Sequence, residues 1–557
     1  MFKRKQITKK KAGTGCLIFL LAIIAGGWLL SLRLHISPPA VSDTHQLAAR
    51  EVTTTGTGEQ IFNGCFLRHS DSGLWEMYLT GNAFERGIAA GKLEKELLKY
   101  QEDVFIDQIK KLIPSEFYLK FLRIFIGIFN RNLAADIPEE LKEEIYGLSL
   151  SCTHEYDYIG SPYERQLNYH AAHDLGHAMQ DYHLVGCTSF AAWNEATDDS
   201  TLLVGRNFDF YAGDDFAKNK TVAFYAPEAG YKFVSVGWAG MAGVLSGMNE
   251  KGLTVTINAA KSSVPLASAT PISIVCREIL QYASTLEEAK QIAAKRKLFV
   301  SESILIGSAI DNRAIIIEKS PEKEGVFQSS GNWLVCANHF QSETFQNDKR
   351  NLENIRTSDS PYRQQRMEEL LRRNIPLNPV LAAGILRNKA GLSDANIGLG
   401  NEKSINQLIA HHSVIFKPKQ KQIWVSTAPW QLGAYVCYDL NKIFAAPDFS
   451  TEIKTELLTI APDTFLNTTQ YTEFLFYREY CKKLKETIHR KAQANEEDIN
   501  RFIRSNPEMY LVYELAGDYY ASQKQAEKAH EYWKCALEKE IPTLAKKEAI
   551  QRKIQER

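Results

Sequence analysis

The spacing of apolar positions changes along the 557 residues, and it predicts an alternation of helical and β-rich segments. Helical spacing dominates residues 75–180, whereas short β-type runs separated by turn residues fill 187–258. Further along, helices are predicted at 271–297, 362–374 and 377–388, and strands at 303–310, 314–318 and 333–337. Elements in this order predict an α+β domain in which helices cover β-sheets.

The N-terminal end has a pattern of its own. Six basic residues between Lys3 and Lys11 precede an apolar run at 16–32. Basic residues ahead of such a run hold that end in the cytoplasm, so 1–33 is predicted to be a signal anchor, a transmembrane helix. The rest of the chain would then lie outside the cytoplasm, on the periplasmic side of a bacterial inner membrane or secreted; a cleaved signal peptide is the alternative. The Ser/Thr/Gly-rich residues 34–60 are predicted to form a stalk.

Residues 446–557 are rich in helix-forming residues. A set of small and aromatic side chains there falls close to the tetratricopeptide pattern: Tyr513, Gly517, Tyr520, Ala529, Trp533 and Ala536. One repeat cannot bury its own apolar face, so we expect it to pack with the preceding helix near 470–500. The region is either a helical cap on the preceding domain or a module that binds a protein partner.

Composition and charge exclude several classes of function. The 66 basic and 66 acidic residues balance, and no basic stripe is present, so nucleic acid is not expected as a partner. The nine cysteines are scattered and form no C-x-x-C pair, which argues against a zinc ribbon or a dense disulfide framework. We expect neither a metal nor a cofactor.

One cysteine stands in a context that favours catalysis. Cys187 follows Gly186, and Arg206 and Asp209 come some twenty residues later, on the predicted second strand of a hairpin. A cysteine thiol is intrinsically nucleophilic, and an α-amino group titrates at about 7.7–8.0, so it can serve as a base near neutral pH. Cleavage of the Gly186–Cys187 bond would create that amine beside the thiol. The pattern predicts an amide-cleaving or acyl-transferring enzyme that processes itself.

Several motifs carry a resemblance to a known family. Residues 187–189 (CTS), 205–209 (GRNFD) and 248–258 (MNEKGLTVTIN) are similar to the N-terminal-nucleophile acyltransferases and hydrolases. So are 78–87 (YLTGNAFERG), 336–340 (CANHF), 360–366 (SPYRQQR) and the hairpin at 413–425. The likeness over about 60–440 points to the acyl-CoA:6-aminopenicillanic acid acyltransferase family, with choloylglycine hydrolases and acid ceramidase as more distant relatives.

The resemblance implies an architecture and a division of the chain. It implies a four-layer αββα sandwich of the N-terminal-nucleophile hydrolase type. A helical prosegment at 61–186 would become the small chain after cleavage, and 187–445 would form the catalytic domain. The substrate would be a small molecule with an acyl-amide bond: an N-acylated amino acid, peptide or lipid.

Roles for individual residues follow from their chemistry and from the resemblance. Cys187 is the predicted nucleophile, and Asp209 would orient the α-amino group or contact the substrate. Arg206 resembles the position of a catalytic arginine in choloylglycine hydrolases. Asn258 and Asn338 are candidate oxyanion donors, because a side-chain amide N–H can meet developing negative charge. Arg363 or Arg366 would lie near the thiol, and their spacing on a helix does not distinguish them.

Three alternatives stay open at this point. His170, His173 and His177 share one face of a helix and could collect a metal for a hydrolase. His339 could replace the α-amine as base. A non-catalytic scaffold could keep the fold and bind partners through the C-terminal helices. Aromatic residues such as Phe208, Phe210, Tyr211, Phe224, Tyr225 and Trp238 suit either an apolar acyl pocket or an ordinary core.

Overall fold

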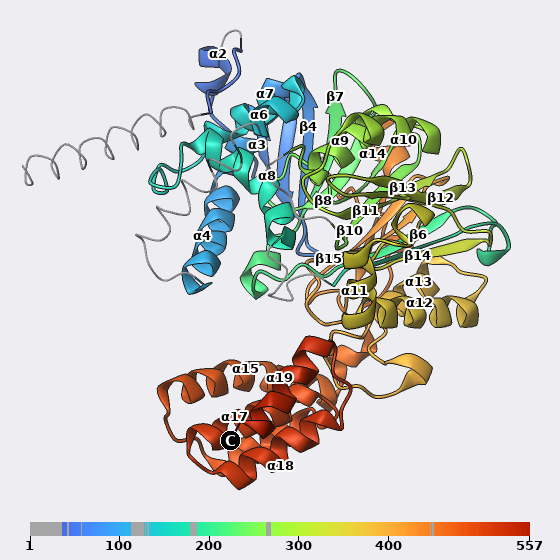
Figure 1. Cartoon of the computed structure of the whole chain (residues 1–557). Coiled ribbons are helices and arrows are strands. Elements are labelled where there is room, and N and C mark those ends of the chain that lie inside the picture. Colours follow the sequence, from blue (N-terminus) through green and yellow to red (C-terminus); the bar gives the residue numbers. More distant parts are fainter. Residues whose placement is uncertain are drawn as a thin grey trace, which may run out of the picture.

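The computed structural model describes residues 36–41, 44–56, 58–112, 127, 130, 133–178, 186–262, 269–445, 447 and 451–556. Two large sheets lie at the centre of the molecule, and a separate group of helices follows them at the C-terminal end (Figure 1). The α+β class predicted from the spacing of apolar residues is confirmed.

The larger sheet has eleven strands in the order β1-β2-β3-β4-β7-β8-β9-β10-β11-β12-β13. All neighbours are antiparallel except β4 and β7, which run parallel. The strands are β1 Thr53–Thr54, β2 Gln60–Phe62, β3 Cys65–His69, β4 Trp75–Gly81, β7 Thr221–Pro227, β8 Phe233–Gly237, β9 Ser246–Asn249, β10 Leu253–Ala259, β11 Glu302–Ser308, β12 Arg313–Lys319 and β13 Glu324–Phe327.

The smaller sheet has six antiparallel strands in the order β14-β5-β6-β15-β16-β17. They are β5 Thr188–Ala192, β6 Leu203–Phe208, β14 Trp333–Cys336, β15 His412–Lys417, β16 Gln422–Ser426 and β17 Tyr435–Asp439. Most positions along the central strands are buried on both faces, which is the pattern of a sheet covered from two sides.

Three apolar clusters show how the layers stack. One joins side chains of the two sheets, such as Phe224 and Val414, and forms the core between them. A second packs the outer face of the larger sheet against α3 Ala83–Leu93, α9 Ile272–Tyr282 and α10 Leu286–Lys295. A third packs the smaller sheet against α12 Ser360–Asn374 and α13 Pro379–Leu386. The described part of the chain therefore stacks helices, sheet, sheet and helices.

The segment predicted to be helical, 61–186, contributes strands as well. Its helices are α3, α4 Lys95–Leu112, α6 Leu133–Asp136, α7 Glu139–Ser149 and α8 Pro162–Ala178. Its strands β2 to β4 extend the larger sheet, and β4 pairs in register with β7 over seven residues, from Trp75↔Thr221 to Gly81↔Pro227. The prediction of a helical prosegment therefore does not hold for residues 65–81, whose apolar residues form the two strands β3 and β4 of this sheet.

The C-terminal helices form a body with its own core. They are α15 Thr469–Arg490, α16 Glu496–Ser505, α17 Tyr510–Ser522, α18 Ala526–Leu537 and α19 Leu544–Gln555. Gly517 allows close approach of α17 and α18, since a Cβ there would meet the backbone oxygen of Ala529 at 3.0 Å. The remaining helices and single turns are α2 Thr44–Ala48, α11 Lys349–Thr357, α14 Leu440–Ala445, η2 Asn194–Ala196, η3 Asp214–Ala217, η4 Glu343–Phe345, η5 Leu392–Asp394, η6 Glu456–Leu458 and η7 Thr464–Asn467.

The predicted signal anchor, including the apolar run at 16–32, lies outside the described residues. Within the residues that are described, no helix is both long enough and apolar enough to cross a membrane. The eight cysteines of this part all carry free thiols.

Candidate active site

Strands β5 and β6 form the predicted hairpin and bring Cys187 beside Arg206. Their register pairs Thr188 with Asn207 and Ser189 with Arg206. Cys187 directly precedes β5 and is 1% exposed. Nη2 of Arg206 donates to Cys187 Sγ at 3.8 Å.

The Arg206 guanidinium is held on several sides. It donates to the backbone oxygen of Leu245 at 2.9 Å, and also to Ser246 Oγ and to the backbone oxygen of Ile257. Its carbon Cζ lies 4.4 Å from the centre of the Phe208 ring. Because the whole side chain is buried, this cation meets the thiol in a fixed orientation.

Burial controls the protonation of the thiol. Removal from water raises the pKa of Cys187 to about 11, although Arg206 and Arg363 oppose that rise. At neutral pH the thiol of the uncleaved chain is therefore protonated. A nucleophilic thiolate requires that a base take the proton as the reaction proceeds.

Asp209 lies just beyond β6 and completes this side of the site. Neither of its carboxylate oxygens has a hydrogen-bond partner among the described residues. Burial raises the pKa of Asp209 to about 7, while Arg363 and Arg206 lower it. Its backbone oxygen accepts from the N–H of Gly186 at 3.0 Å. A buried carboxyl that can gain or lose a proton near pH 7 therefore stands next to the predicted cleavage site.

Arg363 and Asn338 approach from the other side. Arg363 Nη1 donates to the backbone oxygen of Cys187 and to Thr188 Oγ1, both at 2.8 Å. Its Nη2 donates to Asn338 Oδ1 at 2.8 Å. Arg366 points elsewhere, to Asn388, to Glu369 of α12 and to Asp394. Of the two arginines that the sequence left open, Arg363 contacts the cysteine.

The two candidate oxyanion donors are already hydrogen bonded. Asn338 Nδ2 donates to the backbone oxygen of Ala259 at 2.9 Å. Asn258 Nδ2 donates to the backbone oxygen of Cys336 at 3.1 Å, and its Oδ1 accepts from Ser189 Oγ at 2.7 Å. A side-chain amide has two N–H donors, so each asparagine keeps one further hydrogen.

A residue that sequence reasoning missed contacts the peptide at the predicted cleavage site. Gln407 Nε2 donates to the carbonyl oxygen of Gly186 at 2.9 Å, across 221 positions of sequence. Gly186 is not in the left-handed region of φ, so strain is not the reason for glycine here. A Cβ at that position would lie 2.8 Å from Gln407 Oε1, and closer still to Nε2. No local pattern could have revealed this pair.

The alternative chemistries fit the described contacts less well. His170 Nδ1 is bonded to the backbone oxygen of Gln166, and its Nε2 accepts from the N–H of Ala242, so neither ring nitrogen is free for a metal. The side chains of His173 and His177 lie outside the described part. No group of three His, Cys, Asp or Glu side chains in that part could hold a metal ion.

His339, the alternative base, is also engaged. His339 Nδ1 is bonded to Ser360 Oγ, and burial lowers the pKa of His339 to about 4.

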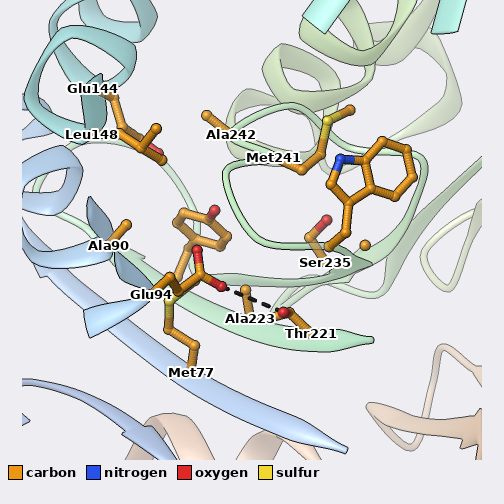
Figure 2. A pocket seen from close by; sticks show the side chains of 13 residues that line it. Met77, Ala90, Glu94, Glu144, Leu148, Thr221, Ala223, Ser235, Met241 and Ala242 are labelled. Atoms are coloured by element: carbon orange, nitrogen blue, oxygen red, sulfur yellow. Dashed lines mark hydrogen bonds between the residues drawn. The ribbon is translucent and has the colours of Figure 1, made fainter. Parts of the chain in front are cut away.

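The aromatic residues named from the sequence divide between core and cavity. Phe224 packs between the sheets, whereas Phe210 and Trp238 line a cavity together with α4 and α8 of the N-terminal segment. Figure 2 shows the neighbouring pocket, where Met241 faces Ala90 and Leu148 of the N-terminal segment. Trp238 also lines this pocket. Glu94 lies in this second pocket and bonds to Thr221.

The central part of the chain is similar to known proteins. Residues 193–427 match the model of the acyl-coenzyme A:6-aminopenicillanic acid acyl-transferase family. Protein dcd1B of Dictyostelium discoideum is 27% identical over 270 residues, which are 45% of this chain and 51% of that protein. An uncharacterized protein of Archaeoglobus fulgidus is 24% identical over 271 residues, 46% of this chain and 45% of that protein. The chain spans about half the length of the curated relatives it matches.

One solved structure is also similar. The Caenorhabditis elegans N-acylethanolamine-hydrolyzing acid amidase ortholog is 18% identical, with a TM-score of 0.31, over 42% of this chain and 93% of that one. The family resemblance that the motifs predicted is confirmed by the family model. Residues 193–427 of this chain belong to the acyl-coenzyme A:6-aminopenicillanic acid acyl-transferase family.

Proposed function

We propose that this protein is a cysteine amidohydrolase or acyltransferase that activates itself by cleaving its Gly186–Cys187 bond. One observation carries the proposal. The buried Cys187 thiol accepts from Arg206, its own carbonyl accepts from Arg363, and the carbonyl before it accepts from Gln407. Polar groups thus surround both the nucleophile and the peptide it would attack.

In the activated enzyme, the freed α-amine of Cys187 would take the thiol proton. The thiolate then attacks the carbonyl carbon of an acyl-amide, the C–N bond breaks, and the protonated amine returns a proton to the leaving nitrogen. Water, or a bound amine, resolves the acyl-thioester and regenerates the thiol. Membership of an acyl-transferase family and the pair of arginines near the cysteine support this assignment.

The substrate class is an N-acylated amino acid, peptide or lipid. The cavity lined by Phe210, Phe216 and Trp238 is apolar enough for an acyl chain. We also propose that the apolar run at 16–32 holds the enzyme in a membrane with the catalytic domain outside the cytoplasm, where water is the default acceptor. Reporter fusions after residue 60 that were active only in the cytoplasm would contradict that topology.

The test is the intact mass of the purified protein. We expect two chains, the larger beginning at Cys187, and a substrate-treated, acid-quenched sample should carry the acyl group on that chain. Cys187→Ala should remain a single chain. Cys276→Ala is the matched control, because Cys276 is another fully buried cysteine that forms no disulfide with the described residues. A wild-type chain that is fully active without cleavage would overturn the mechanism.

A further inference from the structure

Gln407 and Gly186 fit each other closely. The Gln407 side chain is buried, and its amide nitrogen donates to the carbonyl oxygen of Gly186 at 2.9 Å. A side chain at position 186 would occupy the space that this amide fills. Arg363, by contrast, donates to the following carbonyl, that of Cys187. The two carbonyls therefore have different donors, and among the described residues Gln407 is the side chain that donates to the carbonyl that a self-cleaving thiol attacks.

The backbone around Gln407 is fixed on both sides. Asn406 N donates to the backbone oxygen of Asn388 at 2.8 Å, and Asn406 Oδ1 accepts from the N–H of Leu408 at 2.9 Å. Leu408 has a φ of 56°, a left-handed conformation that is unfavourable for a residue other than glycine. Such a conformation persists only where the surroundings hold it.

The C-terminal helices provide some of the contacts that keep Leu408 in this conformation. Leu408 is fully buried in the same apolar cluster as Phe474 of α15 and Met509. Asn506 makes two hydrogen bonds to the backbone of Leu399. Its Oδ1 accepts from the N–H of Leu399 at 2.9 Å, and its Nδ2 donates to the backbone oxygen of Leu399 at 2.8 Å. Asn401 donates to the backbone oxygen of Glu540 at 2.9 Å. The loop 397–408, which carries Gln407, thus packs against the C-terminal helical region.

We propose that Gln407 is the oxyanion donor of the self-cleavage step, and that the C-terminal helices position it. This inference rests on the proposed function. Cys187 Sγ attacks the Gly186 carbonyl carbon through a five-membered ring. The carbonyl oxygen becomes an oxyanion that the Gln407 N–H stabilises. The C–N bond then breaks, and the thiol proton passes to the departing Cys187 nitrogen. Water hydrolyses the resulting thioester, which leaves a Gly186 carboxylate and a free Cys187 thiol.

The experiment follows cleavage of the full chain with time after synthesis. Gln407→Leu keeps the size of the side chain but removes the donor, and it should slow cleavage by about 10²–10³, the usual cost of one oxyanion donor. Hydroxylamine should not restore the rate, because formation of the thioester, not its hydrolysis, is impaired. The matched control is Gln431→Leu, which changes another fully buried glutamine whose amide donates to the backbone oxygen of Leu386.

A second variant separates a chemical role from a structural one. Gln407→Glu retains the shape, and its protonated form has an O–H that can donate. Cleavage of this variant should therefore accelerate as the pH falls, while the slow cleavage of Gln407→Leu should lack that acceleration. Thermal midpoints measured in the Cys187→Ala background report whether each variant folds. A folded Gln407→Leu chain that cleaves at the wild-type rate would overturn the inference about Gln407 but not the proposal of self-cleavage. Cleavage of Cys187→Ala would refute the proposed function itself.

Discussion

Two segments flank the catalytic domain, and they attach to it by different means. The N-terminal segment joins the rest of the domain through the parallel ladder of β4 and β7 and through the buried ion pair between Glu144 and Arg277 of α9. The C-terminal helices form their own core and reach the catalytic domain through side chains of the loop 397–408 and through Leu432 (Figure 1). One segment shares the fold of the domain, while the other contacts it through several loops, one of which carries Gln407 beside the predicted cleavage site.

The difference suggests two distinct tasks. A segment that contributes strands stays bound after its peptide bond to the domain is cut, because the ladder hydrogen bonds and the shared core survive the cut. A segment that contacts only loops has little influence on the core between the sheets. It directly influences the side chains that those loops position, such as Gln407. Perturbing the first should change the stability of the assembled protein, and perturbing the second should change the rate of self-cleavage.

The largest effect is expected at Glu144, which lies between two arginines. Its carboxylate accepts from Arg86 at 2.7 Å and from Arg277 at 3.1 Å, all three side chains being buried. Glu144→Gln leaves the buried Arg277 guanidinium without its carboxylate partner and leaves Arg86 with Glu140 alone, so it should destabilise the protein by about 3–5 kcal/mol. Denaturant unfolding in the uncleaved Cys187→Ala background measures this. Glu140→Gln is the control, because Glu140 also binds Arg86 but is 27% exposed.

An unfolding free energy for Glu144→Gln no different from that of Glu140→Gln would show that the sheet ladder alone holds the N-terminal segment. In the cleaved wild-type enzyme, Glu144→Gln should also release the small chain at a lower denaturant concentration than in the parent.

A smaller, pH-dependent effect is expected at Glu94, between α3 and the catalytic domain (Figure 2). Burial raises the pKa of Glu94 to about 7, although the N–H of Gly240 and Thr221 Oγ1 lower it. The folded state binds this proton more tightly than the unfolded state, so stability falls as the pH rises from about 4.5 to 7. Glu94→Gln cannot ionise and should lose this decline, worth about 2–3 kcal/mol.

The measurement is the free energy of unfolding of Cys187→Ala with and without Glu94→Gln, at pH 5 and pH 8. The variant should gain stability relative to its parent only at pH 8. An equal difference at both pH values would mean that Glu94 ionises in the folded protein as it does in water.

The last prediction concerns Asn506. We expect its substitution to have the smallest effect on stability but a specific effect on self-cleavage. Asn506→Ala removes both hydrogen bonds to Leu399 and loosens the loop that carries Gln407. We expect cleavage to slow about tenfold, the rate equivalent of about 1.4 kcal/mol. Asn495→Ala is the control, since Asn495 is exposed and caps α16 without contacting that loop. Equal cleavage rates in the two variants would mean that the C-terminal helices do not position Gln407.

Local chemistry made part of the site predictable. Cys187, Arg206 and Asp209 lie on one hairpin, and a hairpin is a local structure whose strands the alternation of residues predicts. The sequence could not tell which of Arg363 and Arg366 lies near Cys187, because residues three apart share a helix face. Only the packing of α12 turns Arg363 towards Cys187 and Arg366 towards Asn388.

The sequence by itself determined the α+β class, the order of elements and the family to which its central region belongs, because these depend on short-range periodicity and on contiguous motifs. The tertiary structure alone decided that 65–81 extends the larger sheet and that Gln407 meets Gly186. Both depend on contacts between segments far apart in the chain, and such contacts leave no periodic trace in either segment.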